Sequence, residues 1–180
     1  EVVIVEIDAQ SLQLVNRWPW PRDLYATAIE KLNQAGATQI AFDIDFSSHS
    51  TEQNDRMFAD AIDKSEATVI LPTFRQLAST GQSEFVESLP IPVLRKSAFL
   101  ASVNVSPDNR GQLNRYSYGT TTADTARPSL ASMIAEVQGN IDDSFAIDQS
   151  IDPATIPRLS FVDLLNSDQL STKLAGKKVL

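Results

Sequence analysis

Three short apolar runs in the first half of the chain alternate with amphipathic stretches. The runs cover residues 2–7, 38–46 and 67–74, and their near-continuous apolar character is typical of strands buried on both faces of a parallel sheet. Between them, apolar residues recur at helical spacing at residues 24–35 and again after the polar loop at residues 47–54. This alternation of strands and helices predicts a βαβαβ core with parallel strands and right-handed crossovers.

The second half of the chain predicts shorter elements around this core. Residues 76–97 are polar and contain glycine and proline, so we expect an excursion over the surface. Residues 99–105 and 112–120 both resemble strands, and Gly111 between them suits the left-handed position of a turn. The two segments therefore predict a β-hairpin.

Capping residues and breakers mark the remaining elements. Asp8 and Ser160 are placed to cap short helices, Pro128 to open a longer one, and Gly176 precedes a final strand. Together the segments predict an α/β fold, a three-layer-like mixed sheet with a parallel βαβαβ core, an antiparallel hairpin and flanking helices. We expect one domain that spans residues 1–180.

The composition excludes several classes of site and partner. Apolar residues make up 42% of the chain and charged residues 21%, as in an ordinary globular domain. A net charge of -8 argues against nucleic acid as a partner, and the lack of cysteine excludes disulfides and zinc–thiolate sites. No apolar run approaches the roughly 18 residues of a membrane helix. Because the chain starts at Glu1 without Met and stops in an apolar stretch at residues 177–180, we interpret it as a fragment of a larger membrane protein.

Acidic residues gather where the first two predicted strands end. Asp8 follows the first strand, and Asp43 and Asp45 lie on one face of the second, at the carboxyl edge where open parallel sheets bind ligands. One interpretation is a site for a cation, an amine or a hydroxylated ligand. The other is structural: Asp8 caps a helix, Asp43 pairs with Arg17 or Arg22, and Asp45 is solvated.

The loop at residues 16–23 carries both tryptophans of the chain. Trp18 and Trp20 are each followed by proline and bracketed by Arg17 and Arg22, so the backbone has little freedom. The indoles either form an aromatic wall for a ligand or another subunit, or fold onto the sheet as a lid over the core. Arg22 either binds an anionic ligand group or pairs with one of the nearby aspartates.

An enzymatic interpretation has a weaker basis. Residues 40–46 resemble the Asp-x-Asp motif of magnesium-dependent phosphohydrolases of the haloacid dehalogenase type, but here the motif is on the second strand and the later lysine and paired acids are not evident. His49, the only histidine, lies in a serine-rich loop without a nucleophile signature. The sequence predicts no catalytic residue, no metal ligand and no cofactor, and the phosphohydrolase remains a remote alternative.

The order of these segments resembles the CHASE type-two family, the second class of extracellular sensory domains associated with cyclases and histidine kinases. The Trp-Pro-Trp-Pro-Arg block is the most specific match, and other segments follow in the family's order. They are residues 4–11, 17–22, 35–37, 41–46, 103–108, 128–131 and 174–180, with Gly111 and Arg115.

The resemblance implies an extracytoplasmic input domain of a bacterial inner-membrane signalling protein. It implies flanking membrane helices and a cytoplasmic output such as a nucleotide cyclase, a cyclic-di-GMP enzyme or a kinase of a two-component system. It supplies no general ligand and no catalytic residues. We therefore expect a non-enzymatic periplasmic sensor, homodimeric in the full-length protein, in which a small ligand or a periplasmic partner shifts the population of conformations. The candidate ligand-binding residues are Asp8, Ser11, Trp18, Trp20, Arg22, Asp43 and Asp45. The main alternative is a ligand-independent dimerisation or interaction module with the tryptophans as interface anchors.

Overall fold

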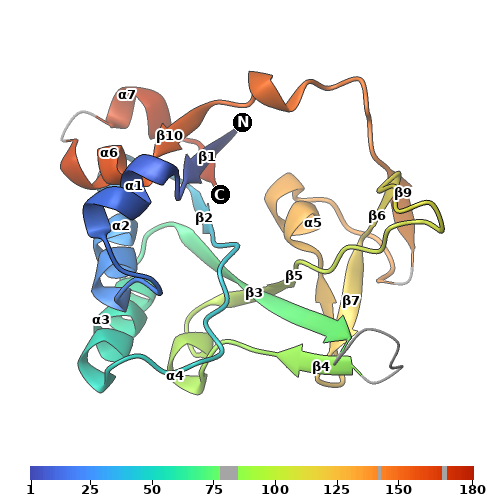
Figure 1. Cartoon of the computed structure of the whole chain (residues 1–180), viewed down its shortest axis with the longest axis horizontal. Coiled ribbons are helices and arrows are strands. Elements are labelled where there is room, and N and C mark those ends of the chain that lie inside the picture. Colours follow the sequence, from blue (N-terminus) through green and yellow to red (C-terminus); the bar gives the residue numbers. More distant parts are fainter. Residues whose placement is uncertain (78–84, 142, 168–169) are drawn as a thin grey trace.

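A mostly parallel sheet runs through the centre of the computed structural model, which describes residues 1–77, 85–141, 143–167 and 170–180 (Figure 1). The strand order is β10-β1-β11-β2-β3-β4, with β5 also paired to β3. The strands are β1 (Val2–Glu6), β2 (Gln39–Ala41), β3 (Thr68–Leu77), β4 (Phe85–Ser88), β5 (Phe99–Ser102), β10 (Arg158–Ser160) and β11 (Lys178–Val179). All pairings are parallel except that of β3 with β4. The predicted parallel core is confirmed, and the final strand β11 lies between β1 and β2.

The helices cover the sheet unequally. They are α1 (Ala9–Val15), α2 (Arg22–Gln34), α3 (Glu52–Asp63), α4 (Pro92–Arg95), α5 (Leu130–Ala135), α6 (Phe161–Asn166) and α7 (Ser171–Leu174), with a 3-10 turn η1 (Pro153–Thr155). The larger core packs α2, α3 and α6 against one face, and on the other face Leu130 of α5 packs on Ala41, Ile70 and Ala101. The predicted layering of sheet and flanking helices is therefore confirmed.

The second strand is shorter than predicted. Its pairing with β11 ends at Ile40 and its pairing with β3 at Ala41, so the chain leaves the sheet as a loop from Phe42. Within that loop Phe42 and Phe46 are buried in the helical core, while Asp43 and Asp45 are exposed. The prediction that these aspartates lie on a strand is wrong. The Phe42 amide still donates to the Ile70 carbonyl of β3 at 3.0 Å, but from there the buried rings of Phe42 and Phe46 anchor the segment in the helical core.

The predicted hairpin between residues 99–105 and 112–120 is also wrong. β5 pairs in parallel with β3, because its residues Ala101 and Ser102 are buried in the main sheet. The later residues form two small antiparallel sheets, in which β6 (Arg115–Ser117) pairs with β9 (Ser144–Ala146) and β7 (Gly119–Thr122) with β8 (Thr125–Pro128). Gly111 does adopt the predicted left-handed conformation, with φ +76°.

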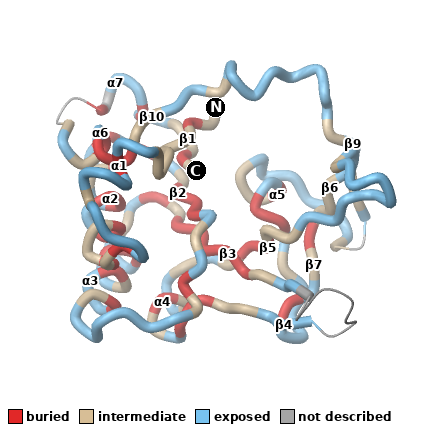
Figure 2. The backbone as a smooth tube through the Cα atoms, in the orientation of Figure 1, coloured by how far each residue is buried: buried red, intermediate tan, exposed pale blue. Residues whose placement is uncertain are grey.

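Several short elements differ from the expected pattern. The segment predicted as a surface excursion contains β4 and α4, and its residues 78–84 lie outside the described residues. Pro128 ends β8, and Ser129 instead caps α5 through a hydrogen bond from the Ser132 amide. Figure 2 shows that the segment joining β9 to β10 is largely exposed, whereas buried residues gather on the main sheet and its helices.

Candidate functional site

The two tryptophans have different environments. Trp20 is 3% exposed and packs its ring 4.8 Å from that of Phe161 and 6.3 Å from that of Tyr25. Trp18 is 58% exposed, and its ring meets that of Trp20 edge-on at 5.8 Å. The peptide bond between Trp18 and Pro19 is cis. The interpretation as a lid over the core is therefore confirmed for Trp20, and Trp18 presents its ring to solvent.

Beside the tryptophans lies a cleft of about 450 Å³, which we call the aromatic cleft. The 16–23 loop forms one wall, and the segment that follows β2 forms the other. The lining residues are Arg17, Trp18, Pro19, Trp20, Pro21, Arg22, Tyr25, Ile44, Asp45, Phe46, Ser48, His49 and Ser50. Burial raises the pKa of Tyr25 to about 12, so its hydroxyl stays neutral at physiological pH.

Arg22 is committed to a buried ion pair at the back of this cleft. Its Nη1 donates to Asp55 Oδ1 at 2.7 Å, and its Nη2 donates to the carbonyls of Phe46, at 3.3 Å, and Ser48. Asp55 also accepts from the Ser50 amide at 3.1 Å. The structural interpretation of Arg22 is therefore correct in kind, but the partner is Asp55 of α3 rather than Asp8 or Asp43. The pair fixes the loop after β2 to two helices.

Asp8 and Ser11 act at a helix junction outside the aromatic cleft. Asp8 Oδ1 accepts from the Ser11 amide at 2.8 Å and caps α1 as predicted, and this hydrogen bonding lowers the pKa of Asp8. Ser11 is fully buried, with its Oγ 3.1 Å from that of Ser160 and accepting from the Val162 amide at 3.2 Å. Ser160 begins α6 without the predicted side-chain capping bond. These residues therefore link α1 to α6.

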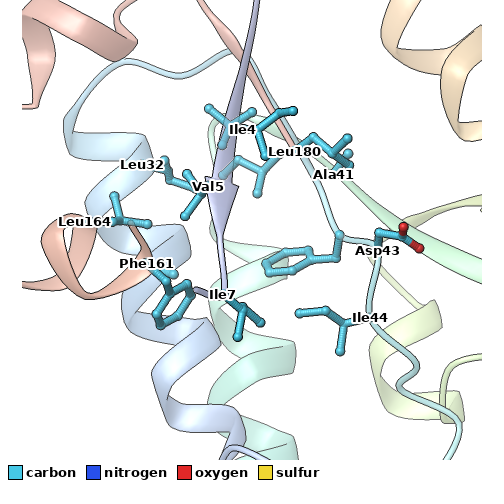
Figure 3. Close-up of a pocket in the computed structure, with 14 residues that line it drawn as sticks. Ile4, Val5, Ile7, Leu32, Ala41, Asp43, Ile44, Phe161, Leu164 and Leu180 are labelled. Carbon is cyan, nitrogen blue, oxygen red and sulfur yellow. The ribbon is translucent and has the colours of Figure 1, made fainter. Parts of the chain in front are cut away.

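The two predicted strand-end aspartates, Asp43 and Asp45, line different cavities. Asp45 lines the aromatic cleft, and its Oδ1 accepts from the Ser47 amide at 2.8 Å. Asp43 instead borders an apolar cavity of about 290 Å³, which we call the central cavity (Figure 3). Its carboxylate points away from the apolar side chains, and partial desolvation of this otherwise accessible group raises its pKa. The predicted pairing of Asp43 with an arginine is not found among the interactions of the described residues.

The central cavity lies between β1 and the segment that follows β2. Its lining is Ile4, Val5, Ile7, Ala28, Leu32, Ile40, Ala41, Phe42, Asp43, Ile44, Phe161, Leu164, Val179 and Leu180. Ile44 lines both this cavity and the aromatic cleft. A wider groove of about 670 Å³ opens on the other face of the sheet, where Asp43 and Tyr116 face α5 residues such as Ile134. Burial and the charge of Asp43 raise the pKa of Tyr116.

Comparison with known protein families shows which family the chain belongs to. A family model described as the CHASE2 domain matches residues 1–180, the whole chain. The chain belongs to the CHASE2 family. CHASE2 domains are extracellular sensory domains and not a catalytic family. No curated protein and no solved structure matches the chain.

Two further findings concern metal-binding groups and membrane-spanning helices in this CHASE2 domain. Across the described residues, no group of three or more histidine or acidic side chains is arranged to hold a metal ion. In the same part of the chain, no helix combines the length and apolar character needed to cross a membrane. The aromatic cleft combines an exposed indole with the polar side chains of Arg17, Asp45 and His49.

The structure brings together only part of the candidate set. Trp18, Trp20, Arg22 and Asp45 line the aromatic cleft, while the remaining three candidates lie elsewhere. The sequence analysis did not identify Asp55, whose ion pair with Arg22 holds that arginine in the wall of the aromatic cleft. Its signal was weak, because Asp55 is one of two acids in the first turn of α3, and acids at that position are ordinarily surface groups that interact favourably with the helix dipole.

Proposed function

We propose that this CHASE2 domain is an extracytoplasmic sensory input domain of a bacterial transmembrane signalling protein and that it senses a small ligand in the aromatic cleft. The observation that carries the proposal is Trp18, an indole 58% exposed at the mouth of a cleft and held edge-on by a buried neighbour. A rigid aromatic face with nearby polar side chains is the usual composition of a small-molecule site. Family membership supports the sensory role.

The proposed mechanism is a population shift. A ligand that binds one arrangement of the aromatic cleft more tightly than another stabilises that arrangement by its difference in affinity. The segment from Phe42 to Phe46 is suited to respond, since it borders both the aromatic cleft and the central cavity. In the full-length protein we propose that flanking membrane helices carry this change to a cytoplasmic output, such as a nucleotide cyclase, a cyclic-di-GMP enzyme or a kinase.

Screening metabolites and cations against the domain tests this function. We expect a true ligand to raise the melting temperature and to change tryptophan fluorescence, with about 2.7 kcal/mol of added stability at one hundred times its dissociation constant. Trp18→Ala removes the exposed wall and should abolish the shift. The matched control is Leu12→Ala, which shortens an exposed apolar side chain on α1, outside the aromatic cleft. This variant should bind the ligand as tightly as the parent domain does.

A ligand whose affinity survives both Trp18→Ala and Asp45→Asn would place the site outside the aromatic cleft. Persistent absence of any thermal shift across charged, polar and apolar compounds would count against small-molecule sensing altogether.

A second candidate is an interaction module without a small ligand. The observation in its favour is that Leu12, Leu14 and Trp18 expose 43%, 63% and 58% of their surface within one helix and the loop after it. Large apolar side chains of this kind are typical anchors of protein interfaces. Under this function, solution mass measurements should reveal a homodimer that Leu14→Ser or Trp18→Ala dissociates, and a monomer at all concentrations would speak against it.

A further inference from the structure

The indole nitrogen of Trp20 is a buried hydrogen-bond donor without an acceptor. The side chain is 3% exposed, and its Nε1 makes no hydrogen bond to any described residue. An indole N–H can only donate, and leaving such a group buried and unpaired destabilises the folded state. Because buried polar groups ordinarily have a partner, this N–H marks a place where a ligand can supply the acceptor.

This donor belongs to the wall of the aromatic cleft. Of the cavities described above, Trp20 lines only that cleft. Its ring packs against those of Tyr25 and Phe161, and Figure 3 shows Phe161 beside the central cavity. These contacts hold the indole in a fixed position, so the aromatic cleft is the space from which an acceptor can approach its N–H.

Two further groups able to donate border the same cleft without a partner. Tyr25 is 2% exposed, and its hydroxyl makes no hydrogen bond with a described residue. Burial raises the pKa of Tyr25 to about 12, so the hydroxyl keeps its proton. Arg17 is exposed, and its guanidinium contacts no acid and no carbonyl in the described part of the chain. Arg22 differs from Arg17, because it is already paired with Asp55.

A carboxylate matches these groups better than a neutral or a cationic group does. Ionised carboxylate oxygens only accept hydrogen bonds, and together they can accept several at once. Hydrogen bonds with one ionised partner are also about twice as strong as neutral ones. The exposed ring of Trp18, centred 5.8 Å from that of Trp20, offers a flat apolar surface for the rest of such a molecule.

We infer that the ligand of the aromatic cleft is a small carboxylic acid with a flat apolar body, and that its carboxylate accepts hydrogen bonds from Trp20 Nε1 and Tyr25 Oη. The charge of Arg17 attracts this end of the molecule, and the body packs on Trp18. The inference rests on the ligand site proposed above and adds the chemical class of its occupant. Asp45, on the wall formed by the segment after β2, carries a charge that opposes the same ligand.

Three probes with the same phenyl body test this class: phenylpropionate, its neutral amide phenylpropionamide, and the cation phenylpropylamine. The chain has two tryptophans, so an isotope-labelled domain gives two indole N–H signals in a nitrogen–proton NMR spectrum, and Trp18→Phe assigns them. We expect phenylpropionate to move the Trp20 signal downfield as it binds. The amide and the amine should bind about tenfold more weakly or less, because each lacks the ionised acceptor.

Substitutions in the wall test the same assignment. Tyr25→Phe keeps the ring, removes the hydroxyl and should weaken phenylpropionate binding about tenfold. Arg17→Gln should weaken it about two- to fivefold, whereas Arg110→Gln, the matched control, removes the same charge from an exposed position outside the cleft and should leave it unchanged. Asp45→Asn should tighten the binding of phenylpropionate, because it removes a like charge.

The inference is overturned if phenylpropionate leaves the Trp20 signal in place, or if the amide or the amine binds as tightly. Unchanged affinity in both Tyr25→Phe and Arg17→Gln would overturn it as well. The ligand site itself is judged by the Trp18 signal: a probe or metabolite that moves this signal but not that of Trp20 retains the site and rejects the carboxylate. Should Tyr25→Phe fail to fold, the comparison of the three probes and Arg17→Gln decide the matter without it.

Discussion

The buried pair of Arg22 and Asp55 allows the sharpest test of the structure. Both side chains are only 6% exposed, and the guanidinium also donates to the carbonyls of Phe46 and Ser48. Asp55→Ala removes the carboxylate and leaves the arginine charge without its counter-ion in the space between α2 and α3. Removing one partner of a buried ion pair costs about 3–5 kcal/mol, because the remaining charge stays desolvated.

This cost is large against the stability of an ordinary domain. For a chain of this length it corresponds to a fall in melting temperature of about 6–20 °C. Urea denaturation followed by circular dichroism gives the free energy of unfolding directly. The matched control is Arg56→Ala on the same helix, which breaks the exposed pair with Glu52 and should cost only about 0.2–0.5 kcal/mol.

A second substitution separates charge from packing. Arg22→Met in the Asp55→Ala background removes the stranded charge and should restore most of the lost stability, since neutral replacements of buried pairs are tolerated. Loss of less than about 1 kcal/mol in Asp55→Ala would refute the reasoning, because it would mean that water reaches Arg22 in the folded state. Failure of Arg22→Met to restore stability would show that packing rather than charge sets the cost.

Three further predictions concern the aromatic residues and Asp43. Trp20→Ala should cost about 3–5 kcal/mol in urea denaturation, because it empties a core position, whereas Trp18→Ala should cost about 1 kcal/mol or less; equal costs would contradict the different burial of the two indoles. Asp43 has a raised pKa in the folded state, so its contribution to stability is present below its ordinary value near 3.8 and is lost as the pH rises through the folded-state pKa. Asp43→Asn should therefore stabilise the domain at neutral pH and leave it unchanged in acid, and melting curves that differ equally at all pH values would reject this. The hydroxyl of Tyr25 should ionise only near pH 12, so the stability contributed by its neutral form is complete below about pH 10 and is lost as the pH rises through about 12. Ultraviolet titration of tyrosine ionisation measures this. If a Tyr25→Phe variant still showed the ionisation near pH 12, that ionisation would belong to another tyrosine.

The elements that the sequence predicts correctly carry strong local signals. β1, α2, α3 and β3 have unbroken apolar runs or clear helical periodicity. The errors arise where pairing is decided by distant residues. β5 has the pattern of a hairpin strand but pairs with β3, because its apolar residues fit the main sheet better than an adjacent strand. β10 has only three residues, with Leu159 as the one apolar side chain, so no periodic signal identifies it.

The candidate site is predictable to a similar extent. The helix cap at Asp8 follows from its position before an amphipathic stretch, and the structure confirms it. The different exposure of Trp18 and Trp20 has no local signal, since both precede proline and the choice depends on Phe161, far along the chain. The partner of Arg22 was missed for the same reason, because Asp55 lies on a helix that packs beside it only in the folded state.

The insertion of β11 between β1 and β2 has a consequence for how the domain forms. β1 and β2 are close in sequence, yet they are joined in the sheet only through Lys178 and Val179. Contacts of such long range form late and slowly, because the intervening chain must first be brought together. As the polypeptide emerges from a ribosome or a translocation pore, β1 and the β2–β3 pair remain unpaired with each other. Their exposed strand edges favour association with other chains. The sheet can therefore close only after residues 178–179 have emerged.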